Sequence, residues 1–279
     1  MNFITDNISI RGYSHILDNK ECQDSSISWS TKKYGAAIVC DGHGGEKYFR
    51  SAIGSKFACQ IGKEAIEVFM DSIERLDKFN IDDKLENLER YIIQSWRTAV
   101  DEHLQNNPFE DDEKYQSLSD ESKKGLESSP IKAYGSTFIA AVMAINFYFI
   151  LKLGDGNANI IYFDDTIEFP KDLEDDQLQF NQTTSLCQSN AIAEFKHTFF
   201  RNINKKAFKG IILTTDGIIN CFNSVKSYHS LIKNIYEGFS NITDPDVYMK
   251  EKEDLESSLH ELSQRGSGDD LSVGIITYK

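Results

Sequence analysis

The stretch Ala37-Ile38-Val39-Cys40-Asp41-Gly42-His43-Gly44-Gly45 joins an apolar run to an acidic, glycine-rich turn. The run is short, continuous and bounded by turn residues, which is typical of a buried β-strand. The glycines after it can adopt backbone angles closed to other residues, and they let an ion or a phosphate approach the main chain. Asp41 offers hard oxygen ligands, and His43 can donate or accept a proton near neutral pH. The stretch therefore predicts a strand that ends in a metal- or phosphate-binding turn.

Acidic residues recur at the edges of other apolar runs. An Asp-Gly pair alone predicts only a turn, but here the pattern repeats along the whole chain, at Cys22-Gln23-Asp24, Gly154-Asp155-Gly156, Asp216-Gly217 and Gly268-Asp269-Asp270. Acids at strand ends converge when the strands pair, and a cluster of carboxylates without balancing cations calls for a divalent metal. The sequence thus predicts a metal site assembled from distant segments.

The order and spacing of these motifs resemble the metal-dependent Ser/Thr protein phosphatases of the 2C type, over nearly the whole chain. The turn at Asp41 resembles the family's DGHGG signature. Four further elements are similar to its GST, GDS, DG and DN/DD-x-S/T elements, namely Gly135-Ser136-Thr137, Gly154-Asp155-Gly156, Asp216-Gly217 and Asp269-Asp270-Leu271-Ser272. The N-terminal Gly12-Tyr13-Ser14-His15 with Cys22-Gln23-Asp24 is similar to a mostly bacterial branch whose members begin with a G-x-S-H…C-Q-D pattern.

The resemblance implies a role for each acid. Asp41 would bridge two divalent ions, Mn²⁺ or Mg²⁺, and the carbonyl of Gly42 would complete the coordination of one. Asp216 and Asp269 would bind the first ion, and Asp155 with Asp216 would serve a third, weaker position. Asp24 would lie behind the metal ligands, where it would orient metal-bound water.

The implied reaction is hydrolysis of phosphoserine and phosphothreonine by attack of a metal-bridging water. Uncatalysed phosphate-monoester hydrolysis is very slow, and two adjacent ions would both activate the water and clamp the phosphoryl oxygens. His43 would be the general acid that protonates the leaving serine or threonine oxygen. We expect phosphorylated proteins as substrates and a cognate Ser/Thr kinase as a functional partner.

Two departures from the family pattern leave other functions open. Gln23 stands where the well-studied eukaryotic members have an acid, and Asp18-Asn19-Lys20-Glu21 lacks their phosphate-binding arginine. Lys20, Arg11 or His15 could substitute for that arginine, although an ordinary structural role is the alternative for each. The flap segment expected between Asp155 and Asp216 is not recognisable. The competing hypotheses are a catalytically weak regulatory module that binds phosphoprotein or metal, and a metal phosphoesterase for small molecules.

Hydrophobic periodicity predicts the architecture. Alternating and continuous apolar runs predict strands over 2–10, 25–30 and 34–40, and helical spacing follows Glu46 and again runs from Leu85 to His103. A three-strand meander is predicted from Gly135 to Phe163, with Asp155 at its second corner. Grouped strands exclude a regular βαβ alternation and favour antiparallel sheets with helices outside. The resemblance makes this an α+β fold, a four-layer α-β-β-α sandwich. We expect one domain over residues 1–279, with a polar insertion at about 105–131.

Composition narrows the partners and the compartment. The net charge of −14 argues against nucleic-acid binding through a basic face and against attachment to an anionic membrane. The five cysteines are widely spaced and form no CxxC pair, so neither a disulfide framework nor a zinc knuckle is expected. The chain shows no N-terminal signal and no run of about 18 apolar residues. We therefore expect a cytoplasmic monomer without a membrane span.

Overall fold

The computed structural model describes residues 3–72, 80–174, 183–201, 208–242 and 244–278. The strands form two five-stranded antiparallel sheets. In order across the first sheet are β1 (Phe3–Ile10), β10 (Leu271–Tyr278), β9 (Phe208–Thr214), β6 (Asn157–Tyr162) and β7 (Ile167–Glu168). The second sheet contains β2 (Ser25–Ser30), β3 (Tyr34–Cys40), β4 (Phe138–Ala144), β5 (Phe147–Leu153) and β8 (Lys196–Arg201).

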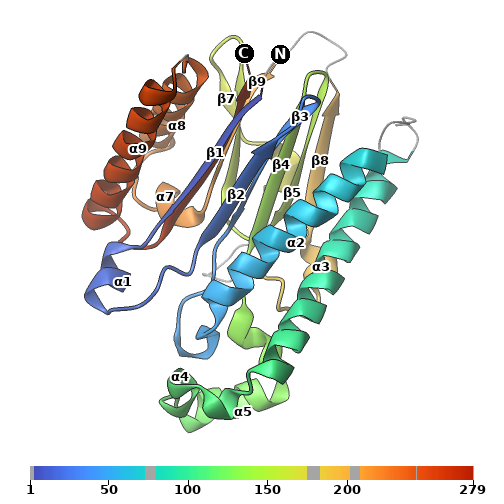
Figure 1. Ribbon diagram of the computed structural model, residues 1–279, viewed down its shortest axis with the longest axis vertical. Coiled ribbons are helices and arrows are strands. Elements are labelled where there is room, and N and C mark those ends of the chain that lie inside the picture. The colour runs from blue at the N-terminus through green and yellow to red at the C-terminus, as the bar shows by residue number, and fades with distance from the viewer. Residues whose placement is uncertain (1–2, 73–79, 175–182, 202–207, 243, 279) are drawn as a thin grey trace.

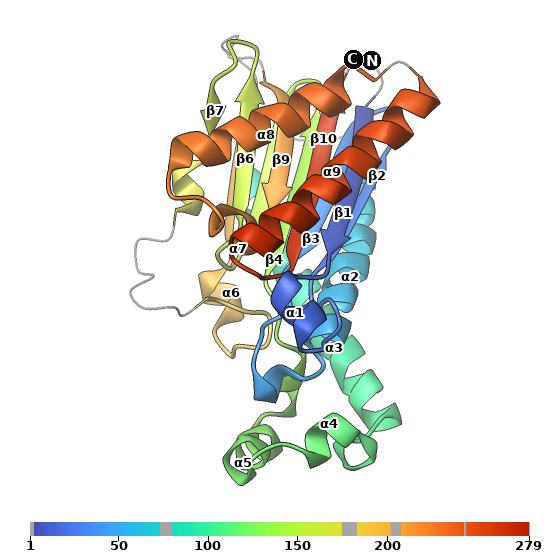
Figure 2. The ribbon, with the colours of Figure 1, turned by 90° about the vertical axis from the view of Figure 1, so that its left-hand side faces the viewer.

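Long helices cover the outer faces of both sheets, which gives the predicted four layers (Figures 1 and 2). The second sheet is covered by α2 (Ser51–Ser72) and α3 (Ile81–Asn106), and the first by α8 (Val225–Ser240) and α9 (Pro245–Arg265). Short helices are α1 (Tyr13–Leu17), α4 (Glu113–Gln116), α5 (Asp120–Ser128), α6 (Ala191–Glu194) and α7 (Asp216–Ile219). The predicted α+β sandwich is confirmed. Among the described residues, every helix is too short or too polar to cross a bilayer.

Strand β3 is apolar on both faces because both of its faces are covered. Ala36 and Ile38 pack in the cluster beneath α2 and α3, whereas Ala37 and Val39 pack between the two sheets. Alternate residues of a strand point to opposite faces, so a strand in the middle of four layers has no polar side. This explains why the run before Asp41 contains no polar residue.

The predicted meander is wrong in its third strand. Strands β4 and β5 form the expected hairpin, but β6 pairs with β9 and β7 in the other sheet. The free edge of β5 is taken by β8, whose residues follow β6 in the sequence. Gly154 has a φ of 112°, in the left-handed region that glycine tolerates. Because β5 and β6 belong to different sheets, Asp155 lies where the chain crosses between the sheets and not at a hairpin corner.

The polar insertion is folded against the start of α2. It contains α4, α5 and two short 3₁₀ turns, Phe109–Asp111 and Pro130–Tyr134. Arg50, only 5% exposed, donates hydrogen bonds to Asp112 Oδ2 (3.1 Å), the Asn107 carbonyl (2.7 Å) and the Tyr134 hydroxyl (2.8 Å). A buried guanidinium with this many partners fixes the insertion in place. Figure 1 shows α4 and α5 beyond the end of the sheets opposite the chain termini.

Candidate metal centre and active site

The strand pairing brings the predicted acids to one end of the sandwich. Asp41 follows β3, Asp155 follows β5, and Asp216 begins α7 just after β9. Asp24 precedes β2, and Asp269 lies two residues before β10. Because β2 runs antiparallel to β3, and β10 antiparallel to β9, an acid before one strand meets an acid after its neighbour. The topology thus gathers residues from five segments.

Three of these carboxylates form a compact cluster. One carboxylate oxygen from each of Asp41, Asp155 and Asp216 lies within 4.8 Å of the others. Burial raises the pKa of Asp41 well above its ordinary value, and the negative charges of Asp24, Asp216 and Asp155 raise it further. The pKa of Asp155 is raised by burial and by Asp216. Carboxylates this close favour a divalent cation among them, and oxygen donors are the ligands that Mg²⁺ and Mn²⁺ prefer.

Asp269 and Asp24 flank this cluster. Burial raises the pKa of Asp269, and the charge of Asp216 adds to the effect. A methyl group on Gly217 would lie 3.4 Å from Asp269 Cβ, so Asp269 is next to the first turn of α7. Asp24 is buried and accepts a hydrogen bond of 2.8 Å from Thr215 Oγ1. Both residues lie beside the cluster without belonging to the group of three.

The GST element supports the DGHGG turn from the facing strand. Thr137 Oγ1 accepts a hydrogen bond from the Asp41 amide (2.9 Å), and the Thr137 amide donates to the Asp41 carbonyl (2.8 Å). Gly42 forms an isolated antiparallel bridge with Ser136, and the His43 amide donates to the Gly135 carbonyl (3.0 Å). These bonds tie both motifs into one rigid unit.

His43 is held inside the site by its main chain and its neighbours. Its carbonyl accepts a hydrogen bond from Gln23 Nε2 (3.1 Å), and its ring packs edge-on against Tyr48 with centroids 5.1 Å apart. Burial lowers the pKa of His43 to about 4, although the charge of Asp216 acts in the opposite direction. A phosphate dianion beside the ring would also favour the protonated imidazole.

The candidate phosphate-binding cations all lie in the N-terminal loop, residues 11–24 between β1 and β2, which includes α1, and each has a partner within the chain. Arg11 donates to the Lys20 carbonyl (3.2 Å), Lys20 pairs with Asp18 (2.9 Å), and His15 Nδ1 lies 3.0 Å from Asp270 Oδ1. The hydrogen bond to Asp270 raises the pKa of His15. Their role in binding phosphate stays a prediction.

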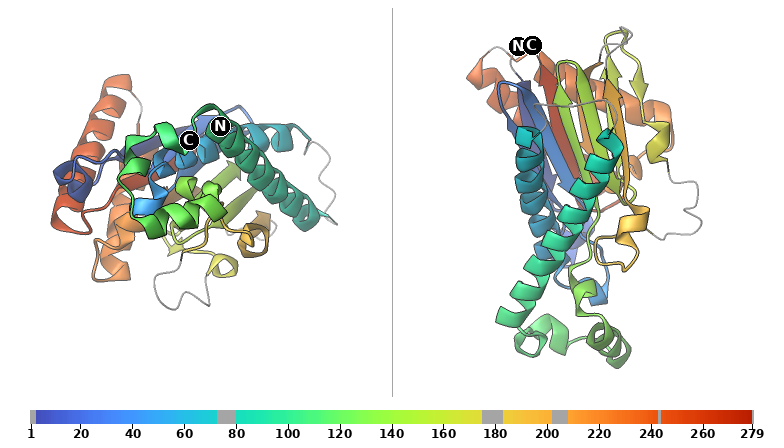
Figure 3. Two further views of the ribbon diagram at one scale, coloured as in Figure 1. Left: turned by 90° about the horizontal axis from the view of Figure 1, so that it is seen from below. Right: turned by 90° about the vertical axis from the view of Figure 1, so that its right-hand side faces the viewer.

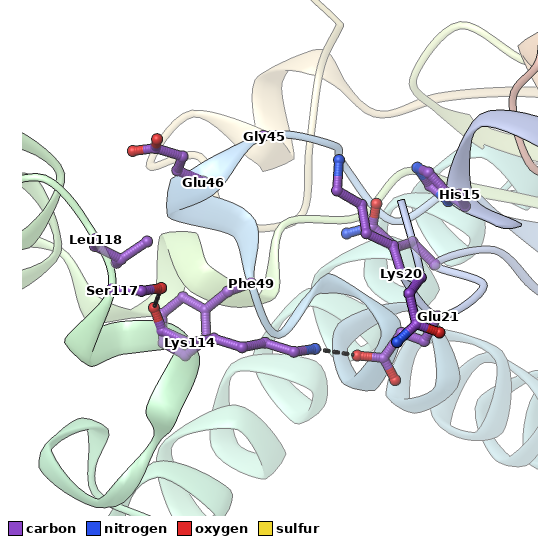
Figure 4. Close-up of a pocket in the computed structure, with 11 residues that line it drawn as sticks. His15, Lys20, Glu21, Gly45, Glu46, Phe49, Lys114, Ser117 and Leu118 are labelled. Carbon is purple, nitrogen blue, oxygen red and sulfur yellow. Dashed lines mark hydrogen bonds and ion pairs between the residues drawn. The ribbon is translucent and has the colours of Figure 1, made fainter. Parts of the chain in front are cut away.

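A pocket of about 400 Å³ separates this loop from the insertion. In Figure 4 the Lys114–Glu21 ion pair, 2.6 Å long, spans the pocket between α4 and the N-terminal loop. Phe49 and Leu118 supply its apolar wall, and His15 lies at the opposite side. Lys114 is neutralised by its partner, so this pocket offers no unpaired cation from the described part of the insertion.

Two residues of the quoted motifs make long-range contacts that the sequence does not indicate. Asp270 accepts hydrogen bonds from the Gly12 and Gln23 amides, each 2.6 Å long, in addition to its contact with His15. Gln23, the departure from the eukaryotic pattern, also donates to Ser51 Oγ (2.5 Å). The second acid of Asp269-Asp270 thus holds the N-terminal loop against the site, which only long-range pairing reveals.

The family model described as protein phosphatase 2C matches residues 11–260. The chain belongs to the protein phosphatase 2C family. This match confirms the sequence-based assignment to the family and to its enzyme class, the protein serine/threonine phosphatases. The assignment to the G-x-S-H…C-Q-D branch stays a prediction. No curated protein matches the chain by sequence.

Solved phosphatase structures share the fold of this 2C-family chain. A bacterial serine phosphatase, solved as a point mutant, has 15% identity and a TM-score of 0.59, with 100% of each chain covered. The phosphatase Stp1 from Staphylococcus aureus has 15% identity and a TM-score of 0.58, with 99% of this chain and 94% of that chain covered. The catalytic domain of PstP, in complex with 2 manganese ions, has 15% identity and a TM-score of 0.53, with 99% of this chain and 98% of that chain covered.

Proposed function

We propose that this 2C-family phosphatase hydrolyses phosphoserine and phosphothreonine in proteins, with Mn²⁺ or Mg²⁺ held by the acidic cluster. The observation that carries the proposal is the convergence of Asp41, Asp155 and Asp216 within 4.8 Å. Asp269 would add a ligand from the start of β10, and the Gly42 carbonyl another from the turn. The proposal places two ions here, with a third at a weaker position near Asp155.

Bound divalent ions supply a water of lowered pKa and neutralise charge on the phosphoryl oxygens. The residues of the chain do the rest. Thr137 and Ser136 hold Asp41 and Gly42 in register, and Asp24, anchored by Thr215, would orient water from behind the cluster. His43 would donate the proton to the leaving serine or threonine oxygen, and the phosphate dianion would help to keep its imidazole charged.

The decisive experiment is phosphate release from a phosphothreonine peptide in Mn²⁺, in Mg²⁺ and in chelator. We expect turnover that depends on the metal and falls by about 100-fold or more in Asp216→Asn, because the substitution removes a charged ligand from the cluster. The matched control is Asp254→Asn, the same change at an exposed position on α9. Folded wild-type protein that binds Mn²⁺ by calorimetry but releases no phosphate would contradict the proposal and favour the regulatory module.

Hydrolysis of nucleotides or sugar phosphates in place of the phosphopeptide would favour the small-molecule phosphoesterase.

We further propose a cytoplasmic, monomeric enzyme that reverses the action of a Ser/Thr kinase. All five cysteines are free thiols, which supports a reducing compartment. Sedimentation of the purified chain tests the monomer.

A further inference from the structure

A second pocket lies between α3, the segment Ser129–Lys132 and the segment that leads into α6. It encloses about 450 Å³ and is lined by Arg97, Ser129, Ile131, Lys132, Cys187, Gln188, Ser189 and Asn190. Figure 3 (right) shows α6 beside the lower half of α3. The lining contains two cations and no carboxylate among the described residues, in a chain whose net charge is −14. A positive pocket in an acidic protein requires an explanation.

The cations of this pocket are not neutralised by any carboxylate in the described ranges. Within the described part of the chain, neither Arg97 nor Lys132 has a carboxylate at ion-pair distance. Arg97 Nη2 donates to the Gln188 carbonyl (2.6 Å), while its buried Nε–H has no hydrogen-bond partner among the described residues. In the first pocket, by contrast, Lys114 is paired with Glu21.

Short stretches of chain connect the pocket lining to the turn that carries His43. Lys132 lies in the 3₁₀ turn Pro130–Tyr134, and the residue after that turn, Gly135, accepts the hydrogen bond from the His43 amide. Consecutive Cα atoms are about 3.8 Å apart, so Lys132 lies within roughly 11 Å of Gly135. On the other wall, Ser185 Oγ donates to the Ser136 carbonyl (3.1 Å), two residues before Cys187.

Lys47 adds a further cation beside His43. Its Nζ lies 4.9 Å from the centroid of the Tyr48 ring, which packs edge-on against the His43 ring. Lys47 too has no carboxylate at ion-pair distance in the part of the chain that the structure describes. Lys47, Lys132 and Arg97 thus place three cations without a carboxylate partner in the described part of the chain near this end of the sandwich.

We propose that the pocket lined by Arg97 and Lys132 is an anion subsite, which binds a second acidic group of the phosphoprotein substrate. This inference rests on the proposed function. The group is a carboxylate or a second phosphate, and the guanidinium and ammonium groups would bind it by charge-assisted hydrogen bonds. An extended peptide advances about 3.3 Å per residue, so the group would lie roughly two to four residues from the phosphorylated residue.

The test uses sets of three phosphothreonine peptides. Within a set the peptides differ at one position, which lies two to four residues before or after the phosphothreonine. That position carries glutamine, glutamate or phosphoserine. We expect kcat/KM to be about 10-fold higher for an acidic peptide than for the glutamine peptide, mainly through a lower KM, because the pocket would bind the acidic side chain. A tenfold gain corresponds to about 1.4 kcal/mol of binding free energy. The preference should shrink in about 0.5 M NaCl, which screens exposed charges. Glutamate as effective as phosphoserine would identify a carboxylate site, and preference for phosphoserine alone a phosphate site.

Variants locate the effect. Lys132→Glu and, separately, Arg97→Gln should lower the ratio of kcat/KM between acidic and neutral peptides to about 1. The ratio is measured within each enzyme, so that differences in overall activity cancel. Lys124→Glu makes the same charge change as Lys132→Glu, at an exposed position on α5 outside the pocket, and should keep the ratio. Equal turnover of all three peptides by the wild type, or a ratio that survives Lys132→Glu and Arg97→Gln, would overturn the subsite. Absence of turnover on every peptide would instead overturn the proposed function.

Discussion

At the scale of single residues, Gly42 shows how little space surrounds the turn that we propose as a metal ligand. A Cβ added there would lie 2.4 Å from the Gln23 carbonyl oxygen and 2.9 Å from the Ser51 carbonyl oxygen. Both are backbone atoms, so Gly42→Ala must displace the turn, at a cost of about 1–3 kcal/mol. We expect this variant to lose about 10-fold or more in Mn²⁺ affinity by calorimetry and to unfold at a lower temperature.

The control for Gly42→Ala is in the same motif. Nothing lies within 4 Å of a Cβ added at Gly44, and its φ is not in the left-handed region. Gly44→Ala should therefore bind Mn²⁺ and unfold like the wild type. Equal behaviour of the two alanine variants would show that the turn tolerates a side chain at Gly42.

At the scale of elements, His197 of the edge strand β8 contacts two acids of helix α3. His197 Nδ1 lies 2.8 Å from the carboxylate of Glu89, which is 5% exposed, and Asp82 lies 3.7 Å from the other ring nitrogen. The hydrogen bond to Glu89 raises the pKa of His197 above its ordinary value. A histidine whose pKa is raised in the folded state stabilises the fold when it is protonated. This contribution is complete at pH values below the pKa in the unfolded state, about 6.5, and it disappears as the pH rises through the pKa in the folded state.

We therefore expect the wild type to exceed His197→Gln in free energy of unfolding by about 1–2 kcal/mol at about pH 6, and by less at about pH 9. Urea unfolding at the two pH values measures the difference. His260→Gln, the same substitution at an exposed position on α9, should show no such trend. A difference between the wild type and His197→Gln that is constant with pH would mean that the pair stabilises only through packing.

At the scale of the whole molecule, the acidic cluster joins the two sheets. Asp41 and Asp155 border the second sheet, and Asp216 follows β9 of the first, so repulsion among them opposes docking of the sheets. Bound metal should reverse this, and an ion at about 100 times its Kd stabilises the fold by about 2.7 kcal/mol. We expect Mn²⁺ to raise the melting temperature of the wild type and EDTA to lower it.

Asp216→Asn removes one charge from the cluster, so without metal it should melt higher than the wild type and should gain little from Mn²⁺. Asp254→Asn should respond to Mn²⁺ as the wild type does. A melting temperature of the wild type that is unchanged by metal would contradict the idea that these carboxylates hold an ion across the sheets.

The sequence by itself determined the motifs and most of the elements. The apolar run before Asp41, the helical spacing after Glu46 and the acids at strand edges are local patterns, and they predicted β3, α2 and the turns that carry the acids. Local propensity and periodicity act over a few residues, which is why these predictions hold. The order of motifs sufficed for the family.

The way in which distant segments pack follows from long-range contacts alone. Strand β6 leaves β5 for the other sheet because β8, which comes later in the chain, occupies the edge of β5. The buried Arg50 holds a polar insertion in place. Arg97 and Lys132 share one pocket although they are far apart in the sequence. Strand pairing, burial and charge proximity depend on contacts between distant residues, and no local pattern encodes these contacts.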